Sequence, residues 1–274
     1  MPHVSQIIIY PVKGMRGHSV PSAVIERQGL AGDRRWMAVG ADGEMLTQRL
    51  APALARVGAR LRGTGLELSA EALPALAFDL EADAAEIDAT VWGDRVRAKV
   101  APPQANAFLT AALGTPASLV FQLDPGSRVA DPAFAAPSDR VSLADGFALL
   151  VTASASLADL NRRLAAPVGM ERFRPNIVVE GLAPWEEDEW RVIRIRELTL
   201  RIVKPCGRCA VITTDQATGA RDRDLEPLRT LSSFRRGAHG EIMFGQNVCP
   251  DGPGHVEVGD EVVIEARCSS NIKG

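Results

Sequence analysis

Excess positive charge and long hydrophobic runs are both missing from this sequence. Its 274 residues include 31 basic and 34 acidic side chains, a formal net charge of −3, so no overall basic field exists to bind nucleic acid or an anionic membrane. The aliphatic run near the start, residues 7–9, is too short for a signal peptide or a membrane span. We therefore expect a cytoplasmic protein with neither nucleic acid nor a membrane among its partners.

Cysteine is scarce too, and several catalytic motifs are missing. Four cysteines in a chain of this length do not make a disulfide framework, which favours a reducing compartment. The sequence contains no Ser-centred nucleophile elbow, no phosphate-binding P-loop and no His-Glu metalloprotease motif, which argues against ordinary hydrolases. The composition that is present, 46% hydrophobic and 24% charged residues, is typical of one large globular domain or two modest ones.

The first part of the chain is expected to be mostly antiparallel β-structure with one helix. Its glycines and prolines are spread out, a pattern typical of short strands separated by tight turns. Residues 104–113 have helical spacing and are followed by Gly114, which predicts a helix that ends there. An Asp-Gly pair predicts a hairpin of residues 36–39 and 44–47. Further strands are expected at residues 4–10, 23–26, 56–60, 65–68 and 89–100, the last with a turn at 93–94.

The second part of the chain begins after a predicted long loop. Residues 124–142 hold three prolines and several charges, which indicates a loop between two β-rich units. Ser156 to Asp159 has the form of a capping box that starts a helix reaching Leu164. A short helix is expected at residues 225–234, and the acidic run 186–189 is expected to be a solvated face. Strands are expected at residues 147–151, 176–179, 191–195, 198–203, 211–214 and 255–266. The predicted class is α+β, mostly β with some α.

Cys206 and Cys209 form the most distinctive local motif. A zinc knuckle needs four ligands, but Cys249 and Cys268 are not closely paired and the four histidines lack ligand spacing. A thioredoxin-like dithiol needs a helix after the pair, whereas the residues that follow look like a strand. A single thiolate ligand to a redox metal, with Arg208 helping to hold an anion, remains open. So does a pair of small buried cysteines without chemistry.

Positive side chains form a second theme. Lys13 precedes Gly14, Arg34 lies in a Gly-Asp-Arg-Arg-Trp segment, and Arg174 precedes a Pro-Asn pair and an apolar strand. Arginine binds phosphate through a bidentate fork, and glycine lets backbone N–H groups join the contact. The alternative is that each is a separate solvated charge. Composition alone does not choose between the two.

These segments, in this order, resemble the MOSC-domain family of molybdenum cofactor proteins, in particular the branch with the mitochondrial amidoxime reducing component and the bacterial YcbX-type proteins. The resemblance implies an N-terminal β-barrel-like domain at residues 1–122, a C-terminal MOSC β-barrel at 123–267 with the cofactor between them, and a short tail at 268–274. The matching segments are Tyr10-Pro11-Val12-Lys13-Gly14, Gly32-Asp33-Arg34-Arg35-Trp36, Ala155-Ser156-Leu157-Ala158-Asp159-Leu160-Asn161, Phe173-Arg174-Pro175-Asn176-Ile177-Val178, Cys206-Gly207-Arg208-Cys209 through Gly219, and Phe244-Gly245-Gln246.

The resemblance also implies site residues and a cofactor, the molybdenum–molybdopterin group. By position, Cys209 matches the molybdenum ligand, and Asp215 matches an acidic residue near the metal, which makes these two the predicted catalytic residues. Asn247 falls at a contact position where relatives carry another residue type. Pyridoxal phosphate binding is associated with the family as a whole, and we assign it no residue. The predicted cofactor-binding residues are Lys13, Gly14, Arg34, Gly146, Phe147, Arg174, Asn176, Cys206, Gly207, Arg208 and Asn247.

The implied activity is reduction of small N-hydroxylated compounds to amines by a molybdenum-dependent oxidoreductase. The chain stops soon after Cys268, without the four clustered cysteines of the ferredoxin domain that YcbX-type relatives carry, so we expect electrons to come from a separate electron-transfer protein. The alternative is a non-catalytic carrier or sensor of molybdenum cofactor or sulfur, with a persulfide on Cys209.

Overall fold

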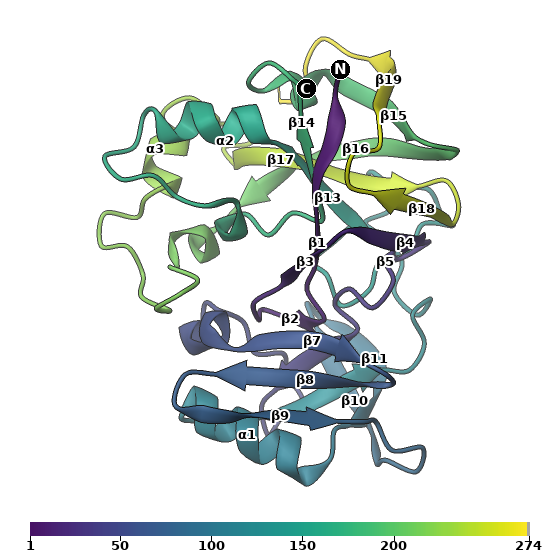
Figure 1. The fold of residues 1–274 in the computed structure, drawn as a ribbon, viewed down its shortest axis with the longest axis vertical. Coiled ribbons are helices and arrows are strands. Elements are labelled where there is room, and N and C mark those ends of the chain that lie inside the picture. Colours follow the sequence, from purple (N-terminus) through teal and green to yellow (C-terminus); the bar gives the residue numbers. More distant parts are fainter. Residues whose placement is uncertain (273–274) are drawn as a thin grey trace.

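Strands make up most of the regular structure in residues 1–272, the part of the chain that this computed structural model describes (Figure 1). The expected α+β class, mostly β, is confirmed. Figure 1 shows two β-rich regions, one above the other, with the N-terminal strand β1 running down the upper region toward the lower one. The lower region is built from residues of the first half of the chain, and the upper one mainly from the second half.

The upper region is organised around an eight-stranded sheet. All neighbours in it are antiparallel except β13 and β14, which are parallel. Its strands, in spatial order, are β19 (Val262–Arg267), β15 (Trp190–Ile195), β16 (Leu198–Arg208), β17 (Ile242–Pro250), β13 (Leu149–Ala153), β14 (Ile177–Glu180), β1 (His3–Ile9) and β3 (His18–Val20).

Three smaller sheets complete the fold. The lower region holds two of them, with Trp36 packed edge-on against Phe78 at a ring-centroid distance of 5.7 Å in the core between them. The five-stranded sheet has the order β10 (Glu86–Val91), β11 (Asp94–Val100), β12 (Ser118–Gln122), β6 (Trp36–Val39) and β2 (Val12–Lys13). The three-stranded sheets are β7 (Gly58–Arg62), β8 (Gly65–Ala70) and β9 (Leu73–Phe78), and β18 (Gly254–Glu257), β4 (Ser22–Glu26) and β5 (Gly29–Leu30).

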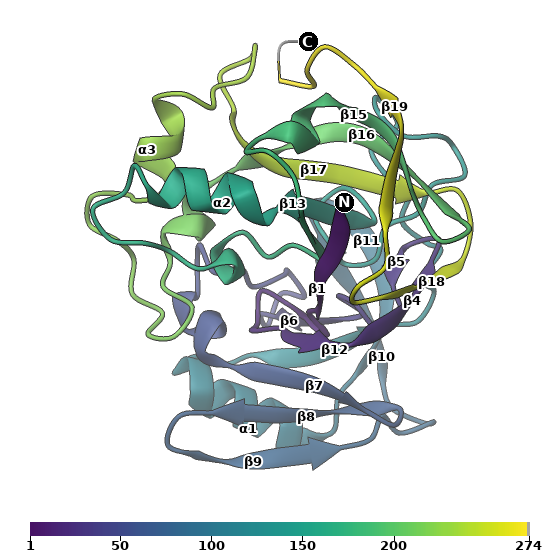
Figure 2. The same cartoon turned by 45° about the horizontal axis from the view of Figure 1, so that its top comes forward.

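The first thirty residues tie the two regions together (Figure 2). β1 pairs with β14, and β4 pairs with β18, although about 150 residues or more separate the partners in sequence. Ile7 and Ile9 of β1 pack in one core with Val151 and Ile177. The domain division at residue 122 stays a prediction. Two strands from before residue 122, β1 and β4, pair with strands from after it.

The described helices are few and short. The predicted helix before Gly114 is confirmed as α1 (Pro103–Leu113), and Gly114 ends it in the left-handed conformation at φ 71°. Residues 123–148 form the expected long loop. The other helices are α2 (Ser154–Asn161), α3 (Leu228–Ser232) and the 3₁₀ turns Pro52–Arg56, Met170–Arg172, Glu186–Glu189 and Ala210–Thr213.

Several sequence-based expectations about local structure are wrong. The strand expected at 211–214 is the 3₁₀ turn after Cys209. The hairpin expected at 36–39 and 44–47 forms only in part: the Leu46 N–H donates to the Ala38 carbonyl at 2.8 Å, but the return makes isolated bridges and no strand. The strand expected at 255–266 is two strands separated by a turn. β17, which forms the centre of the large sheet, was not predicted.

The capping box and the solvated acidic face are wrong for one shared reason. α2 begins at Ser154, two residues before the predicted start. Ser156 lies inside the helix, where its hydroxyl donates to the Glu187 carboxylate at 2.7 Å. Glu187 and Asp188 are buried, and Asp188 accepts two hydrogen bonds from Arg235, at 2.6 and 2.9 Å. Two of the four acidic residues, Glu187 and Asp188, therefore belong to the buried part of the structure, because side chains distant in sequence donate hydrogen bonds to them.

Candidate cofactor site

A cavity lies where residues from the two β-rich regions meet, and it collects the predicted site. It encloses about 1020 Å³ of space, including space that is open to the solvent. Every predicted site residue lines it except Asp215. Lys13, Gly14 and Arg34 come from the segments around β2, and the others from loops and strands of the large sheet.

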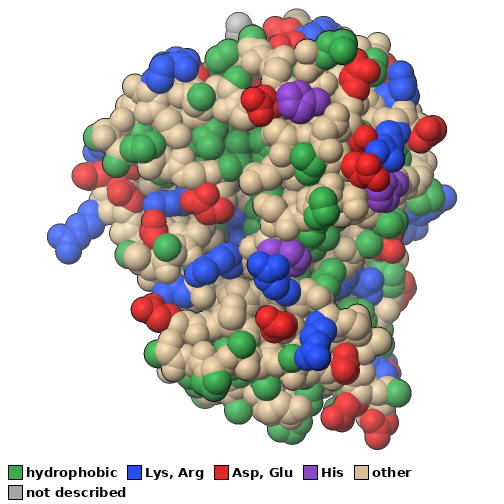
Figure 3. All heavy atoms as spheres, viewed as in Figure 1, with side chains coloured by type: hydrophobic (Ala, Val, Ile, Leu, Met, Phe, Trp, Pro, Cys, Tyr) green, Lys and Arg blue, Asp and Glu red, His purple; other side chains and the backbone are tan. Residues whose placement is uncertain are grey.

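The cavity is strongly positive although the whole chain is slightly negative. The six cations that line it face one carboxylate, Asp145. Figure 3 shows Lys and Arg side chains gathered at the waist between the two regions. Such a local cluster binds an anion without making the whole protein basic. The lining cations are Lys13, Arg34, Arg49, Arg172, Arg174 and Arg208.

Lys13 is held at the floor of the cavity by the long loop. Its Nζ donates to the Leu143 carbonyl at 2.8 Å and to Asp145 Oδ1 at 2.6 Å. Trp92 Nε1 donates to the same carboxylate oxygen at 3.0 Å. Burial lowers the pKa of Lys13, and Asp145 opposes that change. Arg128 fixes the loop behind Asp145, since its guanidinium donates to the carbonyls of residues 142 and 144 at 2.5 and 2.8 Å.

Arg34 and Arg174 adopt left-handed backbone conformations, with φ of 46° and 56°. Such conformations cost about 1–3 kcal/mol each for residues other than glycine and collect at functional sites. Arg34 donates to Asn176 Oδ1 and to the Arg174 carbonyl, both at 3.1 Å. Asn176 in turn accepts from the Leu150 N–H at 3.2 Å. The buried asparagine therefore links these two arginines, which we call the arginine layer, to the beginning of β13.

The charge of Arg174 and Arg208 is not matched by a carboxylate within residues 1–272. Arg174 donates to the Met15 carbonyl at 2.7 Å, and Arg208 donates to the carbonyls of Phe173 and Phe244 at 3.0 and 2.7 Å. Carbonyls orient a guanidinium without neutralising it. Burial, and next the charge of Arg34, lowers the pKa of Arg174 to about 10, so the residue stays charged at neutral pH.

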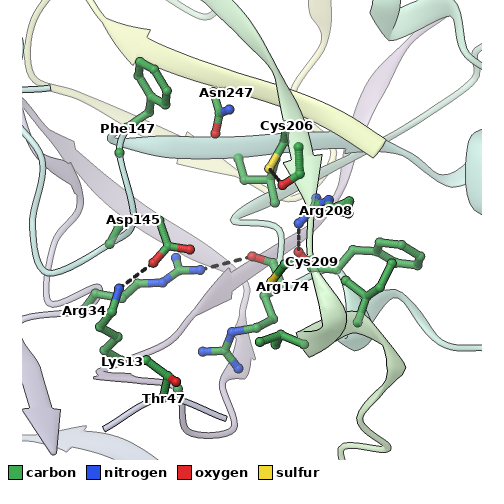
Figure 4. A pocket seen from close by; sticks show the side chains of 18 of the residues that line it. Lys13, Arg34, Thr47, Asp145, Phe147, Arg174, Cys206, Arg208, Cys209 and Asn247 are labelled. Carbon is green, nitrogen blue, oxygen red and sulfur yellow. Dashed lines mark hydrogen bonds and ion pairs between the residues drawn. The ribbon is translucent and has the colours of Figure 1, made fainter. Parts of the chain in front are cut away.

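Two thiols stand on the wall opposite Lys13 (Figure 4). Cys206 lies in β16, where the pairing with β17 is irregular, and Cys209 directly follows this strand. β-bulges commonly aim side chains into active sites. Burial raises the pKa of Cys206, and Arg208 partly opposes that change. Both cysteines are free thiols, half-buried rather than packed in the core.

The structure narrows the alternatives for this cysteine pair. Within the described residues, no three His, Cys, Asp or Glu side chains come together as metal ligands, so a four-ligand zinc knuckle has no support. The inert buried pair has none either, because both residues line the cavity. The 3₁₀ turn of Ala210–Thr213 is too short to be the helix of a thioredoxin-like dithiol. A single thiolate ligand beside anion-binding cations agrees best with this arrangement.

Asp215 lies outside the cavity lining. Its Oδ1 accepts from the Thr218 N–H and hydroxyl at 2.8 and 2.9 Å, and Oδ2 accepts from Arg172 at 3.0 Å. These hydrogen bonds to Thr218, which outweigh partial burial, hold the pKa of Asp215 below its usual value. Arg172 does line the cavity. Asp215 thus reaches the site through Arg172, and its catalytic role stays a prediction.

Sequence reasoning missed part of the lining. Except for Phe173, which stands in the Phe-Arg-Pro-Asn segment, no motif marks these residues, and the polar ones belong to types that are mostly exposed. Trp92, at the tip of the β10–β11 hairpin, carried one usable signal, its place beside the Gly93-Asp94 turn. The missed polar and aromatic lining residues are Thr47, Gln48, Arg49, Trp92, Asp145, Arg172 and Phe173.

The donor set fits a molybdenum–pterin cofactor on three counts. One thiolate suffices as protein ligand when the pterin supplies sulfur ligands of its own, and soft thiolates suit such metals. Arginines held by carbonyls leave positive charge free for a phosphate. The cavity opens between two regions, as cofactor sites commonly do. Fold and site together describe a two-region β protein whose cavity places cysteine thiols beside a cluster of cations.

The chain belongs to the MOSC-domain family. Residues 1–116 match the MOSC N-terminal beta barrel domain and residues 138–263 match the MOSC domain. The sequence is 32% identical to the human mitochondrial amidoxime-reducing component 1, covering 95% of this chain and 82% of that protein. It is 33% identical to the rat mitochondrial amidoxime reducing component 2, covering 85% and 72%.

A rice relative shares the same region within a much longer protein. The rice molybdenum cofactor sulfurase is 32% identical over 89% of this chain, which spans 32% of the rice protein. Among the described residues, no helix is both long and apolar enough to cross a membrane.

Proposed function

We propose that this protein is a molybdenum-cofactor-dependent reductase that converts small N-hydroxylated compounds to amines. The observation that carries the proposal is the meeting of Cys209 with Lys13, Arg34 and Arg174 in one cavity. The names of the mammalian relatives, amidoxime-reducing components, support the same reaction class. The overall change is R–NH–OH plus two electrons and two protons to R–NH₂ and water.

The residues of the chain divide the work of holding the cofactor. The Cys209 thiolate is the proposed ligand to the metal, while Lys13, Arg34 and Arg174 bind the phosphate through charge-assisted hydrogen bonds. The remaining contacts come from the predicted residues that line the cavity with them. When bound, the molybdenum group supplies the two-electron redox chemistry, and the protein supplies orientation and electrostatics.

Electrons are proposed to come from a separate electron-transfer protein. Protons for the product can enter from the solvent side, since the cavity is partly open. Arg172, which lines the cavity, donates to Asp215 Oδ2 at 3.0 Å. We therefore propose that Asp215 positions Arg172, in addition to its predicted catalytic role. We also propose a reducing cytoplasmic location, because all four cysteines are free thiols, and the domain division at residue 122.

The test compares wild type with Cys209→Ala in anaerobic turnover of N-hydroxyadenine with a reduced viologen as donor. We expect the rate of the variant to be lower by at least about a hundredfold. Mutating even a residue that only hydrogen-bonds to a metal ligand typically lowers metal affinity or activity by about ten- to a hundredfold. Cys268→Ala is the matched control, because Cys268 is a half-buried free thiol outside the cavity. Equal rates for wild type and Cys209→Ala would overturn the proposal.

Metal analysis separates the reductase from the cofactor or sulfur carrier. Protein from a host that makes the cofactor should contain molybdenum and pterin close to one per chain, and Cys209→Ala should contain much less. Protein without metal but with a persulfide mass on Cys209 would favour the carrier instead. The printed name of the rice relative, a molybdenum cofactor sulfurase, keeps that second outcome a specific one.

A further inference from the structure

Tyr10 is the sole tyrosine of the chain, and it lies directly behind the arginine layer of the cavity. It follows β1 and is 2% exposed. It is not one of the residues that line the cavity, whereas Arg34 and Arg174 are. Any effect of Tyr10 on a ligand therefore passes through these two arginines.

Both guanidinium groups stack on the same ring. The central carbons of Arg34 and Arg174 each lie 4.3 Å from the centroid of the Tyr10 ring. At this distance a guanidinium is attracted by the negative face of an aromatic ring. Arg34 reaches the ring from the segment after β5, and Arg174 from the segment before β14. One side chain thus organises cations from distant parts of the chain.

The backbone of Tyr10 is fixed by the same network. Its N–H donates to Asp33 Oδ1 at 2.8 Å, and its carbonyl accepts from the Arg34 N–H at 2.7 Å. Asp33 Oδ2 pairs with Arg34 at 2.5 Å. Within residues 1–272 Asp33 forms an ion pair with Arg34 and none with Arg174, and the charge of Arg34 contributes to the lowered pKa of Arg174. The pair keeps excess positive charge that a neutral ring can orient without cancelling.

We propose that the Tyr10 ring is a positioning element that holds Arg34 and Arg174 together as a clamp for a phosphate-type dianion. A carboxylate at this position would neutralise the clamp, and an aliphatic side chain would let like charges separate. The assignment of that anion to the cofactor phosphate rests on the proposed function. The clamp itself rests only on the stacking distances and the charge balance.

The hydroxyl group of Tyr10 takes no part in the clamp. Within residues 1–272 it is buried without a hydrogen-bond partner, and burial raises the pKa of Tyr10 to about 12. A buried hydroxyl without a partner costs stability. Tyr10→Phe should therefore keep anion binding and fold at least as well as wild type, whereas Tyr10→Leu removes the π face.

The test is calorimetric titration of inorganic phosphate into the full chain purified free of cofactor, at low ionic strength. We expect Tyr10→Leu to weaken binding about tenfold or more and Tyr10→Phe to stay within about twofold of wild type, given the usual strength of a desolvated cation–π contact. Phe121→Leu is the matched control, because Arg35 stacks on the Phe121 ring at 4.9 Å away from the cavity. It should leave phosphate affinity unchanged.

A second measurement uses wild type alone and does not depend on a variant folding. With ring-labelled ¹³C-tyrosine, the single tyrosine gives one set of ring NMR signals, and its signal from the Cε carbons should shift on phosphate titration as the guanidinium groups turn toward the anion. An unshifted signal at saturating phosphate overturns the clamp. So does unchanged affinity in folded Tyr10→Leu, or a loss in Tyr10→Phe as large as in Tyr10→Leu. These outcomes do not involve turnover, so the reductase proposal stands or falls separately.

Discussion

Glu187 offers the sharpest test of the structure away from the cavity. Its side chain is fully buried, and its carboxylate accepts hydrogen bonds from the Ser156 hydroxyl at 2.7 Å and the Ala153 N–H at 3.3 Å. Burial, and next the charge of Asp188, raises the pKa of Glu187 to about 7. The perturbation is Glu187→Gln, which keeps the shape and the neutral form that the folded state prefers.

The magnitude follows from the difference between the ordinary pKa of 4.5 and about 7. At about 1.4 kcal/mol for each pKa unit, the folded state loses about 3 kcal/mol relative to the unfolded state once both are ionised. Between these pH values the folded state binds the extra proton, so stability falls as pH rises from about 4.5 and levels off above about 7. Glu187→Gln should therefore stabilise the protein by about 3 kcal/mol at pH 8 and change little at pH 4.

The assay is urea unfolding at a series of pH values from 4 to 8. Glu186→Gln is the matched control, since the pKa of this neighbouring carboxylate is shifted in the opposite direction. Partial burial acts to raise the pKa of Glu186, but hydrogen bonds from Arg267 and the Ala183 N–H hold it below the usual value. Its contribution is present above the ordinary pKa and is lost on acidification, so Glu186→Gln should destabilise more at pH 7 than at pH 4. Parallel pH profiles for wild type and Glu187→Gln would refute the reasoning.

Two further predictions concern the packing around the large sheet. Arg235→Met should lower the free energy of unfolding by about 3–5 kcal/mol, because within residues 1–272 it leaves the buried Asp188 carboxylate with one side-chain partner, the neutral donor Gln246 at 2.8 Å. Chemical denaturation measures this loss. A second change, Asp188→Asn, should restore stability if the unpaired charge is the cause. Gly29→Ala should cost about 2 kcal/mol or more of stability, because φ is +125° and an added Cβ would lie 2.4 Å from the Ala148 carbonyl oxygen. Thermal melting measures this cost. The control is Gly252→Ala, where an added Cβ meets open space, and an equal cost for the two variants would contradict the close approach at Gly29.

Local patterns in the sequence predicted the elements whose stability is local. The helix before Gly114 was found because its apolar spacing and its terminating glycine lie within the same dozen residues. The β10–β11 hairpin was found because its turn residues separate two strands that pair directly with each other. Helix capping and hairpin turns depend on neighbours in sequence, so sequence alone reveals them.

The failures have the opposite character. Residues 211–214 have the composition of a strand but form a 3₁₀ turn, because β16 already pairs with β15 and β17 and the chain must leave the sheet after Cys209. Glu187 looked solvated because its partners, Ser156 and the Ala153 N–H, lie more than 30 residues away. Tertiary partners override local preference in both places.

By itself, the sequence determined the residue types, a thiol at Cys209 and cations at breaks between strands, and predicted that these residues carry the chemistry. The tertiary structure decided that these residues share one cavity, because β1 pairs within the large sheet and the chain after it enters the other region at β2, which brings Lys13 and Arg34 to Arg174 and Cys209. It also placed Asp215 outside the cavity lining and added Trp92 and Asp145 to it. Residue chemistry is written into each position, whereas the distance between positions far apart in sequence exists only once the sheets have paired.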